Sequence, residues 1–375
     1  PLQVRTSPFT EKVTDHNYLY FIRENLVGDG SVFFLADLEE GRIPAEPRKR
    51  VRTHELARVD TRYHHQGERP ESNHFKFTFS RFGRPGTGEV FEFLQVPVPS
   101  RRVEYYTAET GVTFVQLLGL DSPESSGYEW HESLQSFRPG HYLAGWNRAP
   151  LGPAFGDPSE DWGVIRDGKK LNVLVSLLAG SDPTQVTSAA SPEDGMRGTT
   201  TLSRNGVVIG TSDEPGFGQF DIPDSAGTYE LRATATRVVP WSVIGTAADI
   251  KWTFREPGAG AAAKPLPLLV VRAVGDVDEF GRAPAGRNFS LVLQAQRQPG
   301  APTSRLASLK VETSFDDGMT WRDAPSGYFG DVGYTQIRHP AGNGFVSLRI
   351  TARDANGSTV VQTVTRAYQI VSAAK

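Results

Sequence analysis

Three histidines and a nearby carboxylate could bind a metal ion. His64, His65, His74 and Glu71 supply imidazole and carboxylate ligands within eleven residues of sequence. Their spacing matches none of the recognised zinc motifs. Histidines on polar strand faces are usually solvated, so we predict no metal site here.

A second candidate for metal binding is the segment DVDEFG, from Asp276 to Gly281. It resembles the start of a calcium loop, in which oxygen ligands alternate along the chain. Phe280 occupies a ligand position, and no Glu follows at the required distance. We therefore predict a polar loop between strands and no cofactor, with calcium as the alternative.

Ser212 lies in the sequence Gly-Thr-Ser, in which subtilisin-like peptidases carry their nucleophile. Asp213, Glu214 and Pro215 follow it, and two carboxylates beside a serine would oppose a developing oxyanion. A triad also needs a base and an orienting acid, and the sequence contains no His-Gly-Thr, Asp-Thr-Gly or Asp-Ser-Gly. We predict that Ser212 is a hairpin residue and that this chain is not an enzyme.

The stretch SFDDGMTW, residues 314–321, has the Ser-x-Asp-x-Gly-x-Thr-Trp spacing of an Asp-box. Sialidase-type propellers repeat this motif through their blades, whereas this sequence holds one copy. A single copy favours a structural turn between two strands, with Asp316 binding backbone N–H groups and Gly318 at positive φ. The residues that we assign to this turn are Ser314, Asp316, Gly318, Thr320 and Trp321, the last at least partly buried.

Three tryptophans could form a binding surface of another kind. Indole faces stack on sugars, so Trp130, Trp146 and Trp162 are candidate ligand-contact aromatics if they are exposed. An exposed cluster would favour an extracellular glycan-binding or glycan-cleaving β-sandwich protein, and a buried one would oppose it. Residues for glycan cleavage cannot be chosen among the 43 acidic residues.

The elements that must position these residues are expected to be β-strands. The 375 residues include 38 Gly and 26 Pro, a composition typical of many short strands joined by turns. In HFKFTFSRF, for example, Phe75, Phe77 and Phe79 alternate with His74, Lys76 and Thr78, so one face should pack on a core and the other should meet water. Asn205-Gly206 between apolar runs predicts a two-residue hairpin turn.

We expect an all-β fold of tandem antiparallel β-sandwich domains. The predicted domains are a first sandwich at 1–118, a second at 119–256, and an immunoglobulin-like or fibronectin III-like sandwich with about seven strands at 268–375. Residues 257–267, PGAGAAAKPLP, have three prolines and no apolar pattern, which indicates a linker.

Charge and composition limit the classes of partner. The 40 basic and 43 acidic residues give a net charge of -3 without a basic stripe, so we expect no nucleic acid partner. The sequence has no Cys, which excludes disulfides and thiolate metal sites. It has no apolar run of about 18 residues, so we expect no membrane span.

Several phrases together resemble one family. RVEYYTA, FRPGHYLAGWNRAPLGPAFG, TTTLSRNGVVIGTSDEPGFGQFDIP, GTYELRATATRVVPWSVIGTAADIKWTF and RHPAGNGFVSLRITARDANGSTVVQTVTRAY resemble the long C-terminal region of secreted subtilisin-like (S8) serine peptidases of actinobacteria. The resemblance runs from about Tyr18 to Tyr368. The chain also begins at Pro1 without Met, so we expect a piece of a longer protein.

This resemblance implies a secreted, extracellular, non-catalytic β-rich accessory region. In the family, the catalytic domain precedes this region, and none of its triad motifs matches here, so no catalytic residue is carried over. The implied roles are binding, scaffolding or maturation of the protease. The implied partners are the chain's own N-terminal protease domain or its substrate protein, with a cell-surface polymer as a further candidate.

Overall fold

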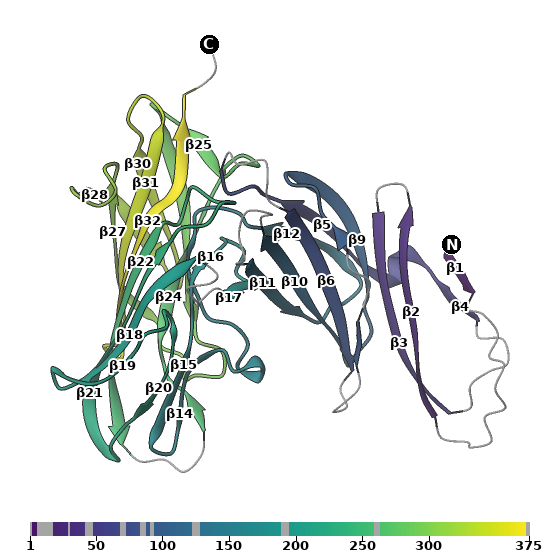
Figure 1. The fold of residues 1–375 in the computed structure, drawn as a ribbon, viewed down its shortest axis with the longest axis horizontal. Helices are drawn as coiled ribbons and strands as arrows, with labels where there is room; N and C mark the ends of the chain where they lie inside the picture. The colour runs from purple at the N-terminus through teal and green to yellow at the C-terminus, as the bar shows by residue number, and fades with distance from the viewer. Residues whose placement is uncertain are drawn as a thin grey trace. The chain divides into compact units, whose positions relative to one another are not determined.

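The structure is a computed structural model that describes residues 2–5, 18–28, 31–41, 48–67, 73–82, 88–90, 94–121, 128–188, 195–258 and 263–372. These residues confirm the all-β fold class, because their regular elements are β-strands apart from two single 3₁₀ turns at Thr53–Glu55 and Pro158–Glu160. None of their helices is long and apolar enough to cross a membrane. Contacts divide the chain into two compact units, which Figure 1 shows with the chain coloured from N- to C-terminus.

The first unit comprises residues 1–63, 74–119 and 132–145 and has two larger sheets and a two-stranded sheet of β1 and β4. One larger sheet has the order β12-β5-β9-β3-β2, and the other contains β11-β10-β6-β7 with β8 beside β6. The strands wholly or partly in this unit are β1 (Leu2–Arg5), β2 (Tyr18–Gly28), β3 (Ser31–Gly41), β4 (Arg48–Val51), β5 (Leu56–Tyr63), β6 (Asn73–Phe82), β7 (Gly88–Val90), β8 (Leu94–Gln95), β9 (Ser100–Thr107), β10 (Val112–Asp121), β11 (Tyr128–Gln135) and β12 (Gly140–Trp146).

Strand β6 alternates as the sequence predicts, but its polar face is the buried one. Lys76 and Thr78 are buried, whereas Phe75, Phe77 and Phe79 are half-buried. Hydrophobicity alone would favour the reverse orientation. The reason is that Lys76 finds a buried carboxylate on β9, and a paired charge can be kept away from water.

The second unit comprises residues 64–73, 120–131 and 146–375, and its first sandwich has two main sheets. One has the order β20-β15-β14-β23, and the other contains β19-β18-β21-β22. The strands are β13 (Gly152–Ala154), β14 (Gly163–Asp167), β15 (Lys170–Leu174), β16 (Ser176–Ala179), β17 (Gln185–Ser188), β18 (Met196–Arg204), β19 (Val207–Ser212), β20 (Phe217–Asp221), β21 (Ser225–Arg237), β22 (Ala247–Gly258) and β23 (Lys264–Pro265). Asn205 and Gly206 have φ of 49° and 82° between β18 and β19, as the predicted hairpin requires.

The C-terminal sandwich has immunoglobulin-like strand order. Its four-stranded sheet runs β24-β26-β30-β29, and its other strands run β32-β31-β27-β28, with β25 parallel to β32. These orders correspond to A-B-E-D and G-F-C with one added strand. The strands are β24 (Leu269–Gly275), β25 (Arg282–Pro284), β26 (Asn288–Arg297), β27 (Leu306–Ser314), β28 (Arg322–Ala324), β29 (Ser326–Phe329), β30 (Val332–Arg338), β31 (Gly344–Asp354) and β32 (Thr359–Val371).

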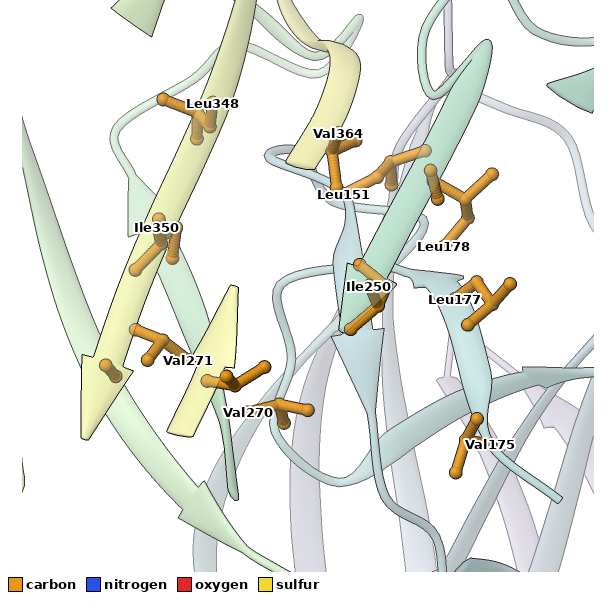
Figure 2. Packing of buried hydrophobic residues seen from close by; sticks show 14 of the residues in the cluster. Leu151, Val175, Leu177, Leu178, Ile250, Val270, Val271, Leu348, Ile350 and Val364 are labelled. Atoms are coloured by element: carbon orange, nitrogen blue, oxygen red, sulfur yellow. The ribbon is translucent and has the colours of Figure 1, made fainter. Parts of the chain in front are cut away.

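The two sandwiches of the second unit share one sheet and one core. β22 pairs with β32 from Ala247–Thr365 to Thr253–Thr359, which makes a nine-stranded sheet. A single buried apolar cluster contains residues of both sandwiches, and Figure 2 shows ten of them labelled, including Ile250, Val270 and Ile350. Trp252 is part of this cluster, and its indole N–H donates to the Leu269 carbonyl at 2.9 Å.

The predicted domain boundaries differ from this organisation in three places. Residues 64–73, predicted in the first sandwich, belong to the second unit. Residues 132–145 belong to the first unit, because β12 continues the sheet beside β5. The predicted linker at 257–267 is a packed connection in its described residues: Gly258 ends β22, Lys264 and Pro265 pair with β14, and Leu266 is buried. Gly258 and Pro265 are the last residues of β22 and β23, so they mark strand ends and not a flexible spacer.

The shared sheet predicts that the C-terminal sandwich depends on β22. A fragment of residues 268–375 exposes the paired edge of β32 and loses the Trp252 contact, so we expect it to unfold at a much lower temperature than the whole chain. A fragment of residues 247–375, which keeps β22, should melt at a higher temperature than the shorter one. Thermal melts of the two fragments and the whole chain test this, and equal melting temperatures for the fragments would contradict it.

Candidate functional site

The Asp-box residues form a hydrogen-bonded turn between β27 and β28. The Asp316 carboxylate accepts from the Thr320 backbone N–H at 2.8 Å, from the Thr320 hydroxyl and from the Ser314 hydroxyl at 2.7 Å. The Ser314 hydroxyl in turn accepts from the Gly318 N–H at 2.8 Å, and Gly318 has a φ of 93°. All these bonds are internal to the turn, which is the arrangement expected for a structural role.

Two arginines pack against this turn. Trp321 is half-buried, and the guanidinium of Arg349 lies 3.9 Å from its ring centroid, within cation–π distance. Arg366 makes a two-pronged contact with the Asp317 carboxylate at 2.9 and 2.6 Å. One face of the Trp321 ring is therefore covered by the Arg349 side chain of the same sheet.

The three candidate tryptophans do not form an exposed cluster. Trp146 is 1% exposed and Trp162 is 4% exposed, and Trp162 packs with Ala154, Ala179 and Val186. The prediction that Trp146 and Trp162 contact a ligand is therefore wrong, because a buried ring cannot stack on a sugar that arrives from solvent. Trp130 is half-buried beside Tyr128, with 5.8 Å between ring centroids.

The histidines are buried rather than solvated, which corrects the sequence expectation. His64 Nδ1 lies 3.1 Å from the Trp146 carbonyl, and the His65 backbone N–H donates to the Glu279 carbonyl. His74 is buried on β6. Glu71 lies outside the described residues, which contain no group of three or more potential metal ligands.

The DVDEFG segment and Ser212 are both engaged in local turns. The Asp278 carboxylate accepts from the backbone N–H groups of Phe280 and Arg282 at 2.9 Å each, and it pairs with the Arg282 guanidinium. Ser212 is the last residue of β19, and its hydroxyl accepts from the Glu214 N–H at 3.3 Å. The Asp278 and Ser212 side chains therefore stabilise local turns.

A buried polar cluster in the first unit escaped the sequence analysis. Lys76 on β6 donates to the Glu104 carboxylate on β9 at 2.7 Å and to the Tyr106 hydroxyl at 2.8 Å. Glu104 also accepts from the hydroxyls of Tyr63 and Thr61 on β5. Burial lowers the pKa of Lys76. Burial alone would raise the pKa of Glu104, but the Lys76 charge and these donors lower it.

The second unit has its own buried ionic cluster. The Arg237 guanidinium on β21 contacts the Glu129 carboxylate at 2.9 and 2.5 Å and donates to Gln66 at 3.0 Å. His131 Nε2 lies 3.0 Å from the other Glu129 oxygen, and the Trp241 indole N–H donates to Glu129 at 3.3 Å. Burial would raise the pKa of Glu129, but Arg237 and His131 together lower it to about 2.

The outward face of the four-stranded sheet in the C-terminal sandwich carries exposed apolar side chains. Val292 on β26 is 51% exposed, Val332 and Tyr334 on β30 are 53% and 65% exposed, and Phe329 on β29 is 92% exposed. Val292 lies opposite Tyr334, and Val332 lies opposite Phe329, so the four share one face. We call these four residues the β26–β30 patch. The outward position of Val292 could have been predicted from the sequence, because it lies between Leu291 and Leu293, which are both buried on β26.

Comparisons with known proteins do not identify a family for this chain. No protein-family model matches the chain, and no curated protein matches it. Trypsin-activated alpha-2-macroglobulin from Escherichia coli is similar over 96% of this chain and 37% of its own, at 10% identity and a TM-score of 0.21. The three N-terminal domains of the outer capsid protein Hoc of bacteriophage RB49 are similar over 85% of this chain and 100% of their own, at 11% identity and a TM-score of 0.19. Likenesses this weak leave function to be argued from the site.

Replacing Asp316 by alanine should lower the melting temperature of the chain, because the Thr320 N–H and hydroxyl lose their acceptor. Hydrogen bonds from Thr320 and Ser314 lower the pKa of Asp316 from 3.8 to about 2. The carboxylate therefore stabilises the fold fully above pH 3.8, and this contribution is lost as the pH falls through about 2. Melting curves from pH 7 to 2 should show the wild type and the variant converging at the acid end.

The control for this experiment is Asp323→Ala, which removes an exposed carboxylate that pairs with Lys310. Its melting temperature should stay close to that of the wild type. A binding screen against glycans completes the test. If Asp316→Ala kept its stability and lost binding to a sugar, the turn would belong to a glycan site.

Glu129→Gln should destabilise the chain by roughly 3–5 kcal/mol, because it leaves the buried Arg237 charge without its counterion. The matched control is Asp249→Asn, which breaks an exposed two-pronged pair with Arg232 and should cost less than about 1 kcal/mol. Urea unfolding at pH 7 measures both. In the wild type, the Glu129 contribution is present above pH 4.5 and is lost as the pH falls through about 2. Equal losses for the two variants would contradict this prediction.

Proposed function

We propose that this chain is a non-catalytic binding region that accompanies a secreted subtilisin-like serine peptidase. The observation that carries the proposal is the β26–β30 patch, in which four large apolar side chains stand exposed on one sheet face. Contiguous exposed apolar surface on a folded protein commonly marks an interaction site. The sequence resemblance supports the context, since it places a protease domain before this region.

The composition of the patch favours a protein partner. Tyr334 and Phe329 supply aromatic area, and aromatic residues are enriched where interfaces carry binding energy. Gln294 lies opposite Val332, and Gln336 is the next outward residue of β30 after Tyr334; both are exposed and can add hydrogen bonds at the rim. The proposed partners are the catalytic domain of the parent peptidase or the protein that it cuts.

A glycan remains the second candidate ligand for the same face. An exposed tyrosine ring flanked by amide side chains can stack on a sugar and bind its hydroxyls. The burial of Trp146 and Trp162 removes two of the three tryptophans on which the sequence argument for glycans rested, and leaves Trp130 half-buried. A polysaccharide arm in the binding experiment separates the two ligand classes.

The test compares the whole chain with the double variant Phe329→Ser/Tyr334→Ser. Binding is measured by biolayer interferometry to a subtilisin-like catalytic domain and to casein, and by sedimentation with chitin and cellulose. We expect protein binding that weakens at least about tenfold in the variant, because loss of two aromatic contacts costs at least roughly 1.4 kcal/mol.

The matched control is Val207→Ser/Val208→Ser, which replaces two exposed valines on β19, 65% and 60% exposed, at a different surface. Its binding should equal that of the wild type. Absence of protein binding by the wild type, or equal loss in both double variants, would refute the proposal. Loss of polysaccharide binding confined to Phe329→Ser/Tyr334→Ser would support the glycan alternative.

A further inference from the structure

The buried cluster of the first unit brings an amine, a carboxylate and a carboxamide together around one hydroxyl. The Tyr106 hydroxyl lies 2.8 Å from Lys76 Nζ and 2.8 Å from Gln116 Oε1. Lys76 Nζ lies 2.7 Å from Glu104 Oε2. Lys76 and Gln116 belong to the neighbouring strands β6 and β10, whereas Glu104 and Tyr106 come from β9 in the other sheet. All four side chains are buried.

The surroundings of the amine are aromatic. Lys76 Nζ lies 5.5, 5.8 and 5.6 Å from the ring centroids of Phe34, Tyr63 and Tyr106. Away from water, charged groups lose their hydration, so the neutral amine and carboxylic acid approach the ion pair in free energy. Desolvation is one of the ways in which proteins turn a lysine into a nucleophile. The same burial keeps water from competing for the amide carbon.

We propose that Lys76 and Gln116 form an intramolecular amide crosslink, with Glu104 as the proton carrier. Glu104 takes a proton from Lys76, and the free Nζ attacks Gln116 Cδ. The new Nζ–Cδ bond forms, and Glu104 gives its proton to Nε2. The Cδ–Nε2 bond then breaks, and Glu104 takes the second proton from Nζ, which leaves a neutral amide. One ammonia leaves, and no oxidant or second substrate is needed.

Tyr106 has the position of an oxyanion donor in this reaction. Its hydroxyl donates to Glu104 Oε2 at 2.7 Å and to Gln116 Oε1 at 2.8 Å, and it can turn fully to Gln116 Oε1 when that oxygen carries the negative charge after the amine has added. Tyr63 and Thr61 donate to Glu104 and hold its carboxylate in place, so they are positioning residues. The product would join β6 to β10 covalently in the middle of the sheet.

The experiment is intact-mass spectrometry of the purified, folded chain, followed by peptide mapping. We expect a mass lower than that of the sequence by one ammonia, and one branched peptide that links Lys76 to Gln116. A folded wild-type chain with the full mass, or with the missing ammonia mapped to other residues, would overturn the proposal. This result is decisive without any variant.

Two variants then test the roles of the residues. Glu104→Gln keeps the amine and the amide but removes the proton carrier, so the full sequence mass is expected. Thr78→Val changes a buried residue two positions along β6 from Lys76 and leaves the reacting and positioning groups in place, so it should retain the crosslink. If Glu104→Gln formed the linked peptide as completely as the wild type, Glu104 would have no part in the chemistry.

Discussion

The pairing of β22 with β32 is the contact on which the second unit depends. It joins the edge of one sandwich to the edge of the next through backbone hydrogen bonds, from Ala247–Thr365 to Thr253–Thr359. Because the two strands then share a sheet, their inward side chains pack in one apolar cluster. Trp252 anchors this arrangement from β22, since its ring lies in the cluster and its N–H bonds to β24. Two sandwiches that could each have been a domain thereby form one compact unit with a shared core.

Each compact unit also buries a carboxylate with a cation. Glu104 is paired with Lys76 in the first unit, and Glu129 is paired with Arg237 in the second. A buried ion pair is seldom the most stable choice, because well-packed apolar residues can replace it without loss. A slip of one residue would turn these side chains to the other face of the strand and separate the charges. We therefore infer that the two pairs help to specify which strands face one another.

Local patterns predicted the strands well, because alternation records which side of a strand meets the core. On β21, for example, the apolar Tyr229, Leu231, Ala233 and Ala235 are buried, and the residues between them are exposed or half-buried. The same rule misled at β6, where Lys76 is inside, since its partner Glu104 is 28 residues away and no local window contains both.

Features that depend on residues far apart in the sequence could not be predicted, for a related reason. The sequence 257–267 has the composition of a linker, and the structure is needed to show that its described residues 264–266 are packed, by the pairing of β14 with β23 and the burial of Leu266. Likewise, Trp146 and Trp162 look like binding residues by type, whereas their burial is decided by loops and strands elsewhere in the chain. The Asp-box turn was predictable because its hydrogen bonds lie within residues 314–320.

The β22–β32 joint also bears on self-association. An open sheet edge exposes a row of backbone N–H and C=O groups, on which another chain can add a strand and begin to aggregate. Each edge that is matched to a neighbour of the same chain is closed to such growth. In the nine-stranded sheet the open ends are β19 and β28, and β28 is three residues long. The joint therefore closes the edges of two long strands, β22 with 12 residues and β32 with 13, and should lower the tendency of the chain to self-associate.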